Sequence, residues 1–198
     1  MIPVDHVLYI NLEYRTDRKE HLLKQANKAG IPDNKLTRIS AIHTPSIGML
    51  GCSLSHCKAL ELAKSHPEWE WTLILEDDIV FEENPWNEIR LALENVTPDV
   101  LMIARGASVV DERRHHSSNN ICKVKSACVS CGYIVHRKYI PTLLKNIYES
   151  IEHFIQPGGN TVDHPHDVYW YSIQERDGWY TFEHSPAHQD TSIKSDIR

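Results

Sequence analysis

Residues 71–81 read WTLILEDDIVF, and the rest of the chain is interpreted around them. The uncharged, mostly apolar run of residues 71–75 is typical of a buried strand in a parallel sheet. Three carboxylates, Glu76, Asp77 and Asp78, follow at its carboxyl end, the end at which open α/β sheets bind ligands. Adjacent acids repel one another unless a cation or hydrogen-bond donors are present. We interpret the triplet as a metal and nucleotide site, although an isolated triplet is more often a solvated acidic turn.

Length and composition indicate one soluble globular domain over residues 1–198, with 41% apolar residues. The net charge of −6, with scattered basic residues, gives no footprint for nucleic acid or an acidic membrane surface. No apolar run approaches the roughly 18 residues of a spanning helix, and the N-terminus enters a strand pattern directly. Five cysteines without a disulfide-scaffold spacing favour reduced thiols. We therefore expect a cytoplasmic protein without a signal peptide or membrane span, and the oligomeric state stays open.

The first 42 residues follow a strand, helix, strand pattern. A strand is expected at residues 7–12, and a helix follows, in which Asp17 and Glu20 have capping-box spacing. A second strand is expected at residues 36–42, which completes a right-handed βαβ unit. Next, a turn between Gly48 and Gly51 precedes a helix whose first turn is expected to hold Ser53, Ser55 and His56, where free N–H groups favour anions.

The second half continues the alternation of strands and helices. Strands are expected at residues 100–104 and 179–182, with short strands across residues 122–135. Helices are expected across residues 141–154 and 168–173, and an irregular tail carries His184, His188 and Gln189. Asp163, His164 and His166 share a Pro-containing turn without a further spaced ligand pair, so the spacing does not favour zinc there.

Alternation along a strand separates the three acids. Glu76 and Asp78 are two positions apart, so in a strand-like backbone they point to one side and Asp77 points away. Two carboxylates on one side can share a divalent ion, and oxygen ligands suit Mg²⁺ or Mn²⁺, which complete their shells with phosphate and water. Such an ion would neutralise a departing diphosphate during transfer from a nucleotide-activated donor.

Six segments in series resemble glycosyltransferase family 25, the lipooligosaccharide and procollagen galactosyltransferases. They cover almost the whole chain in the family's order: YINLEYRTDR (9–18), GMLGCSLSHCKAL (48–60), ILEDDIVF (74–81), CGYIVHRK (131–138), HPHDVYW (164–170) and AHQDTSIKSDI (187–197). Each segment alone is a weak signal, but the series is specific and favours the metal interpretation of the acids.

The resemblance implies a single GT-A-like, Rossmann-like α/β domain, with a mixed, mainly parallel central sheet flanked by helices. It implies an inverting, metal-dependent enzyme that moves a hexose from a UDP-sugar to a hydroxyl of a glycan or a hydroxylysine-type protein acceptor. Galactose is the simplest donor sugar, with glucose and N-acetylglucosamine as alternatives. The corresponding biological roles are lipopolysaccharide biosynthesis and collagen glycosylation.

The resemblance also implies roles for individual residues. The ion, Mn²⁺ or Mg²⁺, would lie on Asp78, with Glu76 on the ribose or a metal-bound water, and His188 as a third ligand from the tail. The remaining donor-binding candidates are Arg15, Arg18, Ser55, His56, Asp77 and Gln189. Inversion requires a base to take the acceptor proton, and Asp167 is the candidate, with a helix N-cap as the alternative role.

One segment departs from the family pattern. Many members carry Ala, an aliphatic residue, Asp and Gly after the second strand, whereas this chain has Ala41, Ile42, His43 and Thr44. A donor contact carried by that Asp is therefore absent or replaced. This departure supports the alternative hypothesis of a transferase-like module that binds a nucleotide sugar or glycan without catalysis.

Overall fold

The computed structural model describes residues 1–106, 108–110, 120–156 and 165–196. The strands are β1 (His6–Asn11), β2 (Leu36–Ser40), β3 (Trp71–Glu76), β4 (Ile79–Phe81), β5 (Val100–Met102), β6 (Ser108–Val110), β7 (Ile121–Ala127), β8 (Gly132–His136), β9 (Trp179–Phe182) and β10 (Ala187–Gln189). The α-helices are α1 (Thr16–Lys28), α2 (Gly48–Lys64), α3 (Trp86–Val96), α4 (Ile140–Ile155), α5 (His166–Tyr169) and α6 (Tyr171–Gln174).

The central sheet is mixed. Within the described residues it has eight strands in the order β2-β1-β3-β8-β5-β9-β7-β6. Strands β1, β2 and β3 are parallel, as are β5 and β9, whereas β8 and β7 run antiparallel to their neighbours. Most strands therefore point the same way, and the expected mixed, mainly parallel α/β sheet is confirmed.

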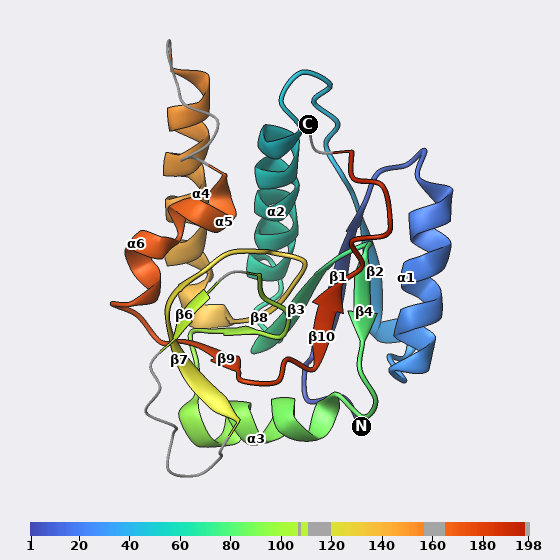
Figure 1. Cartoon of the computed structure of the whole chain (residues 1–198), viewed down its shortest axis with the longest axis vertical. Coiled ribbons are helices and arrows are strands. Elements are labelled where there is room, and N and C mark those ends of the chain that lie inside the picture. The colour runs from blue at the N-terminus through green and yellow to red at the C-terminus, as the bar shows by residue number, and fades with distance from the viewer. Residues whose placement is uncertain (107, 111–119, 157–164, 197–198) are drawn as a thin grey trace.

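Helices cover both faces of this sheet, as Figure 1 shows. Successive residues of β1 alternate between two cores, with Val7 and Tyr9 in one and Leu8 and Ile10 in the other. The first core takes apolar side chains from α1 and α3, and the second takes them from α2, α4 and α6. The central strands are buried on both faces, which explains their continuous apolar sequences.

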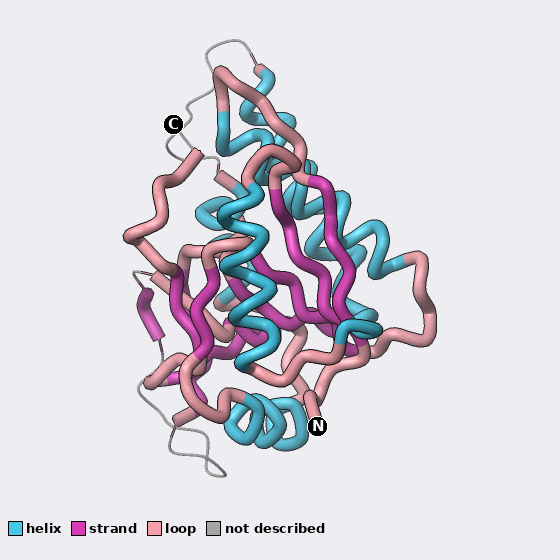
Figure 2. Tube along the Cα trace, turned by 90° about the vertical axis from the view of Figure 1, so that its right-hand side faces the viewer, coloured by secondary structure: helices cyan, strands magenta, loops and turns pink. Residues whose placement is uncertain are grey.

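The carboxyl ends of the parallel strands meet at one edge of the sheet. In β1 and β3, Tyr9 pairs with Leu75 and Ile10 with Glu76, so the acid triplet begins level with the end of β1. Figure 2, turned by 90°, shows loops at both ends of these strands. The βαβ arrangement thus presents the acids at the edge where α/β proteins bind ligands.

The structure corrects two expectations about local structure. Helix α2 begins at Gly48, so Gly51 lies inside it rather than in a preceding turn. A Cβ atom on Gly51 would lie 2.5 Å from the Ile42 carbonyl oxygen, which explains why glycine suits this close helix–loop contact. The tail is not wholly irregular, because β10 pairs antiparallel with β4 and places Gln189 opposite Ile79.

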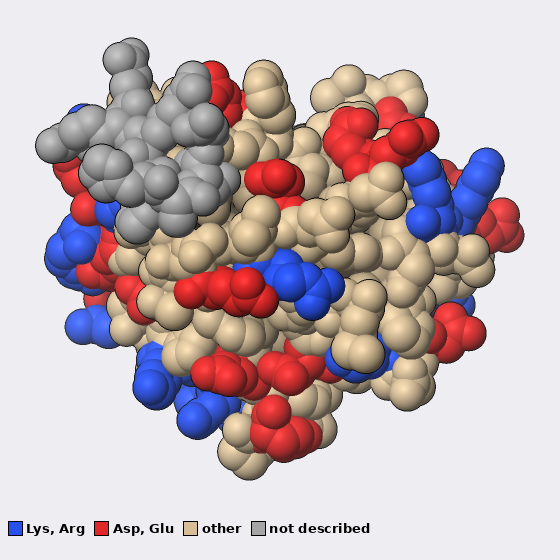
Figure 3. Space-filling view, turned by 90° about the horizontal axis from the view of Figure 1, so that it is seen from below, with Lys and Arg blue, Asp and Glu red and all other residues tan. Residues whose placement is uncertain are grey.

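The surface of one end of the molecule carries both signs of charge. On the face drawn in Figure 3, basic and acidic side chains lie interspersed. Within the part of the chain that the structure describes, no helix has both the length and the apolar character needed to cross a bilayer.

Candidate functional site

A cavity lies at the carboxyl ends of β1 and β3. Its walls come from residues 10–12, Arg18 of α1, residues 41–44, the first two turns of α2, the acid triplet and tail residues 189, 195 and 196. Segments distant in sequence therefore converge on the acids. Glu76, Asp77 and Asp78 all contribute to the lining.

Arg18 is the cation that contacts the acids. Its Nε lies 2.6 Å from Asp77 Oδ1, and its Nη2 donates a 2.6 Å hydrogen bond to Asp78 Oδ2. All three side chains are nearly buried, so this charge pairing is screened little by solvent. Asn11 Nδ2 adds a 2.7 Å hydrogen bond to Asp77 Oδ2. The expectation that Asp77 points away from Asp78 is wrong, because β3 ends at Glu76 and strand alternation does not continue into the turn.

Asp78 keeps one oxygen without a partner. Its Oδ2 accepts from Arg18 and, at 3.1 Å, from Gln189 Nε2. Its Oδ1 is buried and has no hydrogen-bond partner among the described residues. A buried carboxylate oxygen without a partner costs folding free energy, and a cation or a hydrogen-bond donor of a ligand would supply the missing partner.

Burial sets the ionisation behaviour of the triplet. It raises the pKa of Glu76, Asp77 and Asp78 above their ordinary values, because desolvation disfavours the charged form. The neighbouring charge of Glu76 raises the pKa of Asp78 further, while Arg18 opposes the rise. Three acids therefore face one arginine, and the site attracts additional positive charge.

Glu76 points toward a different set of partners. Its Oε1 accepts a 2.6 Å hydrogen bond from Ser130 Oγ and lies 3.3 Å from His56 Nε2. His56 is fully buried, and burial lowers its pKa to about 3, so its ring is neutral. The structure therefore brings Glu76 and His56 together, as side chains in contact.

The α2 residues do not form the expected anion-binding first turn. Because α2 begins at Gly48, Ser53, Ser55 and His56 lie in its second and third turns, where N–H groups are used within the helix. Ser55 lines the cavity, but its Oγ donates to the Gly51 carbonyl and accepts from the Ile42 N–H at 2.8 Å. Its contacts fix the loop that forms one wall.

Arg15 binds the tail. It pairs with Asp17 at 2.8 Å, with the Asp196 carboxylate, and with the Lys194 carbonyl at 3.1 Å. Arg15 does not line the cavity, whereas Asp196 does. The structure thus places Arg15 behind the tail rather than against the cavity.

Strand alternation separates His188 from Gln189. Gln189 faces Asp78, while His188 Nδ1 lies 2.9 Å from Glu82 Oε1, and both of these side chains are more than half exposed. His188 does not line the cavity. The expectation that His188 serves as a third metal ligand therefore does not fit, because neighbouring strand residues point to opposite sides and Gln189 takes the inner one.

Asp167 lies in the first turn of α5. Its Oδ2 accepts a 3.1 Å hydrogen bond from the Val129 N–H, across from another element. The residue at the N-cap of α5 is Pro165, without a side-chain capping bond, so Asp167 does not act as the cap. Asp167 is half-buried and does not line the cavity.

A sequence comparison decides the family. The family model described as glycosyltransferase family 25 (LPS biosynthesis protein) matches residues 33–164, about two thirds of the chain. The chain belongs to glycosyltransferase family 25. It is therefore a glycosyltransferase, with a sugar donor and an acceptor as substrates. No curated protein sequence matches it significantly.

Solved structures agree with the fold of this glycosyltransferase. A glycosyltransferase involved in glycosylation of the major capsid of PBCV-1 superposes with a TM-score of 0.58 at 11% identity, covering 96% of this chain and 94% of that one. Protein A197 from STIV superposes with a TM-score of 0.51 at 15% identity, covering 92% and 83%. At these identities the likeness concerns the GT-A-like fold alone.

Several residues that contact the predicted site residues of this glycosyltransferase were not singled out by the sequence. Asn11, Ser130 and Asp196 contact Asp77, Glu76 and Arg15 respectively. Asn11 carried a visible signal, since it is a polar residue that interrupts an apolar strand. His43 and Thr44 do line the cavity, so the departure from the family pattern falls on its wall.

Proposed function

We propose that this glycosyltransferase moves a hexose from a UDP-sugar, most simply galactose, to a hydroxyl group of a glycan or protein acceptor, with inversion at the anomeric carbon. Residues 1–198 would act as one catalytic domain. The observation that carries the proposal is the buried Oδ1 of Asp78, which has no hydrogen-bond partner among the described residues and lies beside two further acids in the cavity. A metal-assisted diphosphate departure uses such a group.

The residues fit a divalent ion. Asp78 offers Oδ1 while Arg18 and Gln189 hold Oδ2, and Glu76 and Asp77 lie on the same cavity wall. An all-oxygen donor set suits Mn²⁺ or Mg²⁺. When bound, the ion supplies neutralisation of the charge that develops on the departing diphosphate.

The chain's own residues position the donor. Arg18 pairs with Asp77 and Asp78 and would be the cation that contacts the diphosphate. Arg15 is less well placed for this role because it binds the tail. Asn11 fixes Asp77, and Gln189 fixes Asp78. Glu76, oriented by Ser130, is the candidate ribose contact.

Asp167 is the proposed base. In a single in-line displacement, the acceptor oxygen forms a bond to the anomeric carbon while the bond from that carbon to the diphosphate oxygen breaks. UDP leaves with the electron pair, and Asp167 takes the proton of the acceptor hydroxyl. The Val129 N–H holds the carboxylate in orientation for this transfer.

A donor screen tests the proposal. UDP release is measured with UDP-galactose, UDP-glucose and UDP-N-acetylglucosamine, with glycan and hydroxylysine-containing acceptors, in Mn²⁺, in Mg²⁺ and in chelator. We expect turnover with one donor, and we expect this turnover to be lost in chelator. Calorimetric UDP binding without turnover for any donor would instead favour the non-catalytic binding module.

Substitution of Asp78 by Ala tests the metal site. Because the ion's neutralising effect amounts to several kcal/mol, we expect activity to fall by about 10³-fold or more. Gln189→Ala should lower activity by about 10- to 100-fold, since it removes a hydrogen bond to a charged group. The matched control is the exposed neighbour, His188. The activity of His188→Ala should stay within about twofold of that of the wild type. Equal losses at positions 188 and 189 would contradict the assignment.

A further inference from the structure

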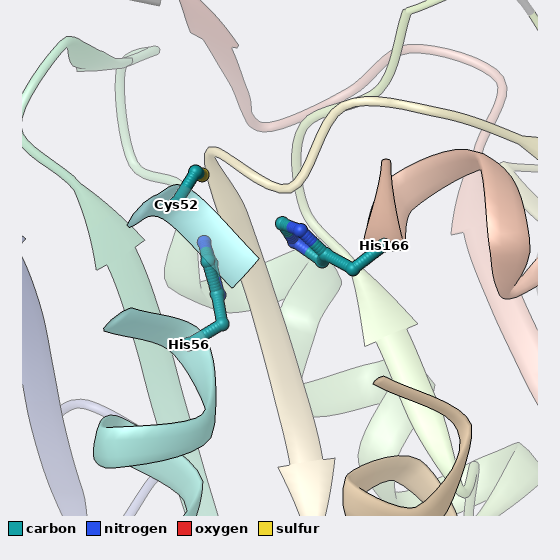
Figure 4. Close-up of side chains that lie close together, drawn as sticks. All are labelled: Cys52, His56 and His166. Carbon is teal, nitrogen blue, oxygen red and sulfur yellow. The ribbon is translucent and has the colours of Figure 1, made fainter. Parts of the chain in front are cut away.

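A second cluster of ligand-type side chains lies beside the acids. One ligand atom each from Cys52, His56 and His166 lies within 4.8 Å of the other two. Cys52 and His56 are four residues apart on α2, so they share one helix face, and His166 begins α5. Figure 4 shows His166 reaching from α5 toward the two α2 side chains.

Both imidazoles are already oriented by hydroxyl groups. His56 Nδ1 lies 3.0 Å from the Tyr133 hydroxyl, and His166 Nδ1 lies 3.1 Å from Ser53 Oγ. Nδ1 of each ring therefore serves for orientation, while His56 Nε2 lies 3.3 Å from Glu76 Oε1 and His166 Nε2 is left for another partner. Metal-ligating histidines are usually held in this way, by a hydrogen bond to the ring nitrogen that does not bind the metal.

One of these nitrogens is buried without a partner. His166 is 2% exposed, and its Nε2 has no hydrogen-bond partner among the described residues. A neutral imidazole is the form that binds a metal, through a ring nitrogen that carries no proton. An unpartnered nitrogen at such a position costs folding free energy, which a bound ion would offset.

We propose that Cys52, His56 and His166 bind a zinc ion. A thiolate and two imidazoles are ligands that zinc prefers, and oxygen-preferring Mn²⁺ or Mg²⁺ would not choose them. Binding releases one proton from the Cys52 thiol as the sulfur–zinc bond forms. Zinc holds its ligand atoms about 3.3–3.8 Å apart, so small side-chain rotations close the cluster on the ion.

Glu76 borders the cluster. Its Oε1 lies within hydrogen-bond distance of His56 Nε2, at 3.3 Å, so zinc on that nitrogen would replace this hydrogen bond. The site would join α2 to α5 directly before Asp167. Zinc therefore has a positioning role here: it would fix the helix that carries the proposed base relative to the cavity wall.

Metal content measures the site directly. The chain, purified and reconstituted with zinc sulfate and then freed of excess ion, should hold about one zinc per chain by plasma mass spectrometry. Cys52→Ser and His166→Gln should each lower this content at least about tenfold. The matched control is Cys57→Ser, which removes a buried thiol from the same helix outside the cluster. It should retain the zinc.

Cobalt substitution of the wild-type chain avoids dependence on variant folding. Co²⁺ should give tetrahedral visible bands with a thiolate-to-cobalt charge-transfer band, and added zinc should bleach both. Asp78→Ala should retain zinc, which separates this inference from the proposed oxygen-ligated site. Wild-type protein without stoichiometric zinc or thiolate-cobalt bands would overturn the proposal, as would a Cys52→Ser variant with normal zinc content.

Discussion

The acid triplet and the cysteine–histidine cluster are two regions of buried polar side chains, and these side chains are stabilised in different ways. Asp77 and Asp78 carry charge into the interior, and Arg18 pairs with both of them. His56 and His166 lie in the interior as neutral rings, oriented by hydroxyl groups, and His166 Nε2 stays unpartnered within the described chain. The first region already contains a counter-charge, Arg18, whereas the second relies on neutral rings and hydroxyl groups.

Glu76 connects the two regions. It is the last residue of β3 and the first of the triplet, yet its carboxylate contacts Ser130 and His56. A change in one region is therefore expected to reach the other through this side chain. The comparison predicts that the two regions respond differently to loss of a partner and to added metal.

The largest expected effect comes from removing the counter-charge of the acids. Arg18→Met leaves Asp77 and Asp78 buried without their cation, which should lower the free energy of unfolding by about 3–5 kcal/mol. Urea denaturation followed by circular dichroism measures this change. Arg38→Met is the matched control, because Arg38 donates to the neutral Asn11, to its side-chain and backbone oxygens. It should cost about 1 kcal/mol.

A result in which both arginine variants lose the same small amount would contradict the comparison. It would mean that the acids are protonated or hydrated rather than paired with Arg18. The double variant Arg18→Met, Asp77→Asn separates these outcomes, because removing one acid should recover part of the loss if the ion pairs are real.

The next effect depends on zinc. His166→Leu in chelator should leave the free energy of unfolding unchanged or raise it by about 1 kcal/mol, because it removes an unpartnered buried nitrogen along with one Ser53 contact. With zinc at 100 times its dissociation constant, the wild type should melt about 5–10 °C higher, and the variant should not. Thermal scans in chelator and with zinc check both expectations. A large loss of stability in chelator would show that His166 is structural without metal.

Much of the fold was predictable because it depends on local pattern. The apolar runs at β1 and β3 predicted buried parallel strands, and both are interior strands of the sheet. Strand β10 was missed because Ala187–Gln189 is short and gains its structure from pairing with β4. The start of α2 was misplaced because Gly51 was interpreted as a turn residue, whereas its role is to allow a close contact with Ile42.

The site was predictable only in part, since its partners come from distant segments. The triplet itself marked the cavity, but no sequence spacing links Arg18 to Asp77 and Asp78 or Gln189 to Asp78. Cys52 and His56 have a visible helical spacing, while His166 lies on another helix. Its sequence neighbours Asp163 and His164, which the sequence groups with it, lie outside the described residues.

The smallest effect concerns the tail. Arg15 pairs with both Asp17 and Asp196, but only Asp196 lines the cavity. Asp17 is exposed and Asp196 is partly exposed, so replacing either by Ala should change the stability of the fold little. Asp196→Ala should nevertheless raise the KM for the sugar donor about three- to tenfold, because the tail wall is released from Arg15.

Asp17→Ala provides the control for this prediction, because it removes a partner of Arg15 without touching the cavity wall. Steady-state kinetics with a fixed acceptor should show an unchanged KM for that variant and similar kcat values for both. If the two variants raise KM equally, the charge on Arg15 matters and the tail does not. If neither changes KM, donor binding does not use the tail wall, and the ion pair serves only to hold residues 194–196 on the surface.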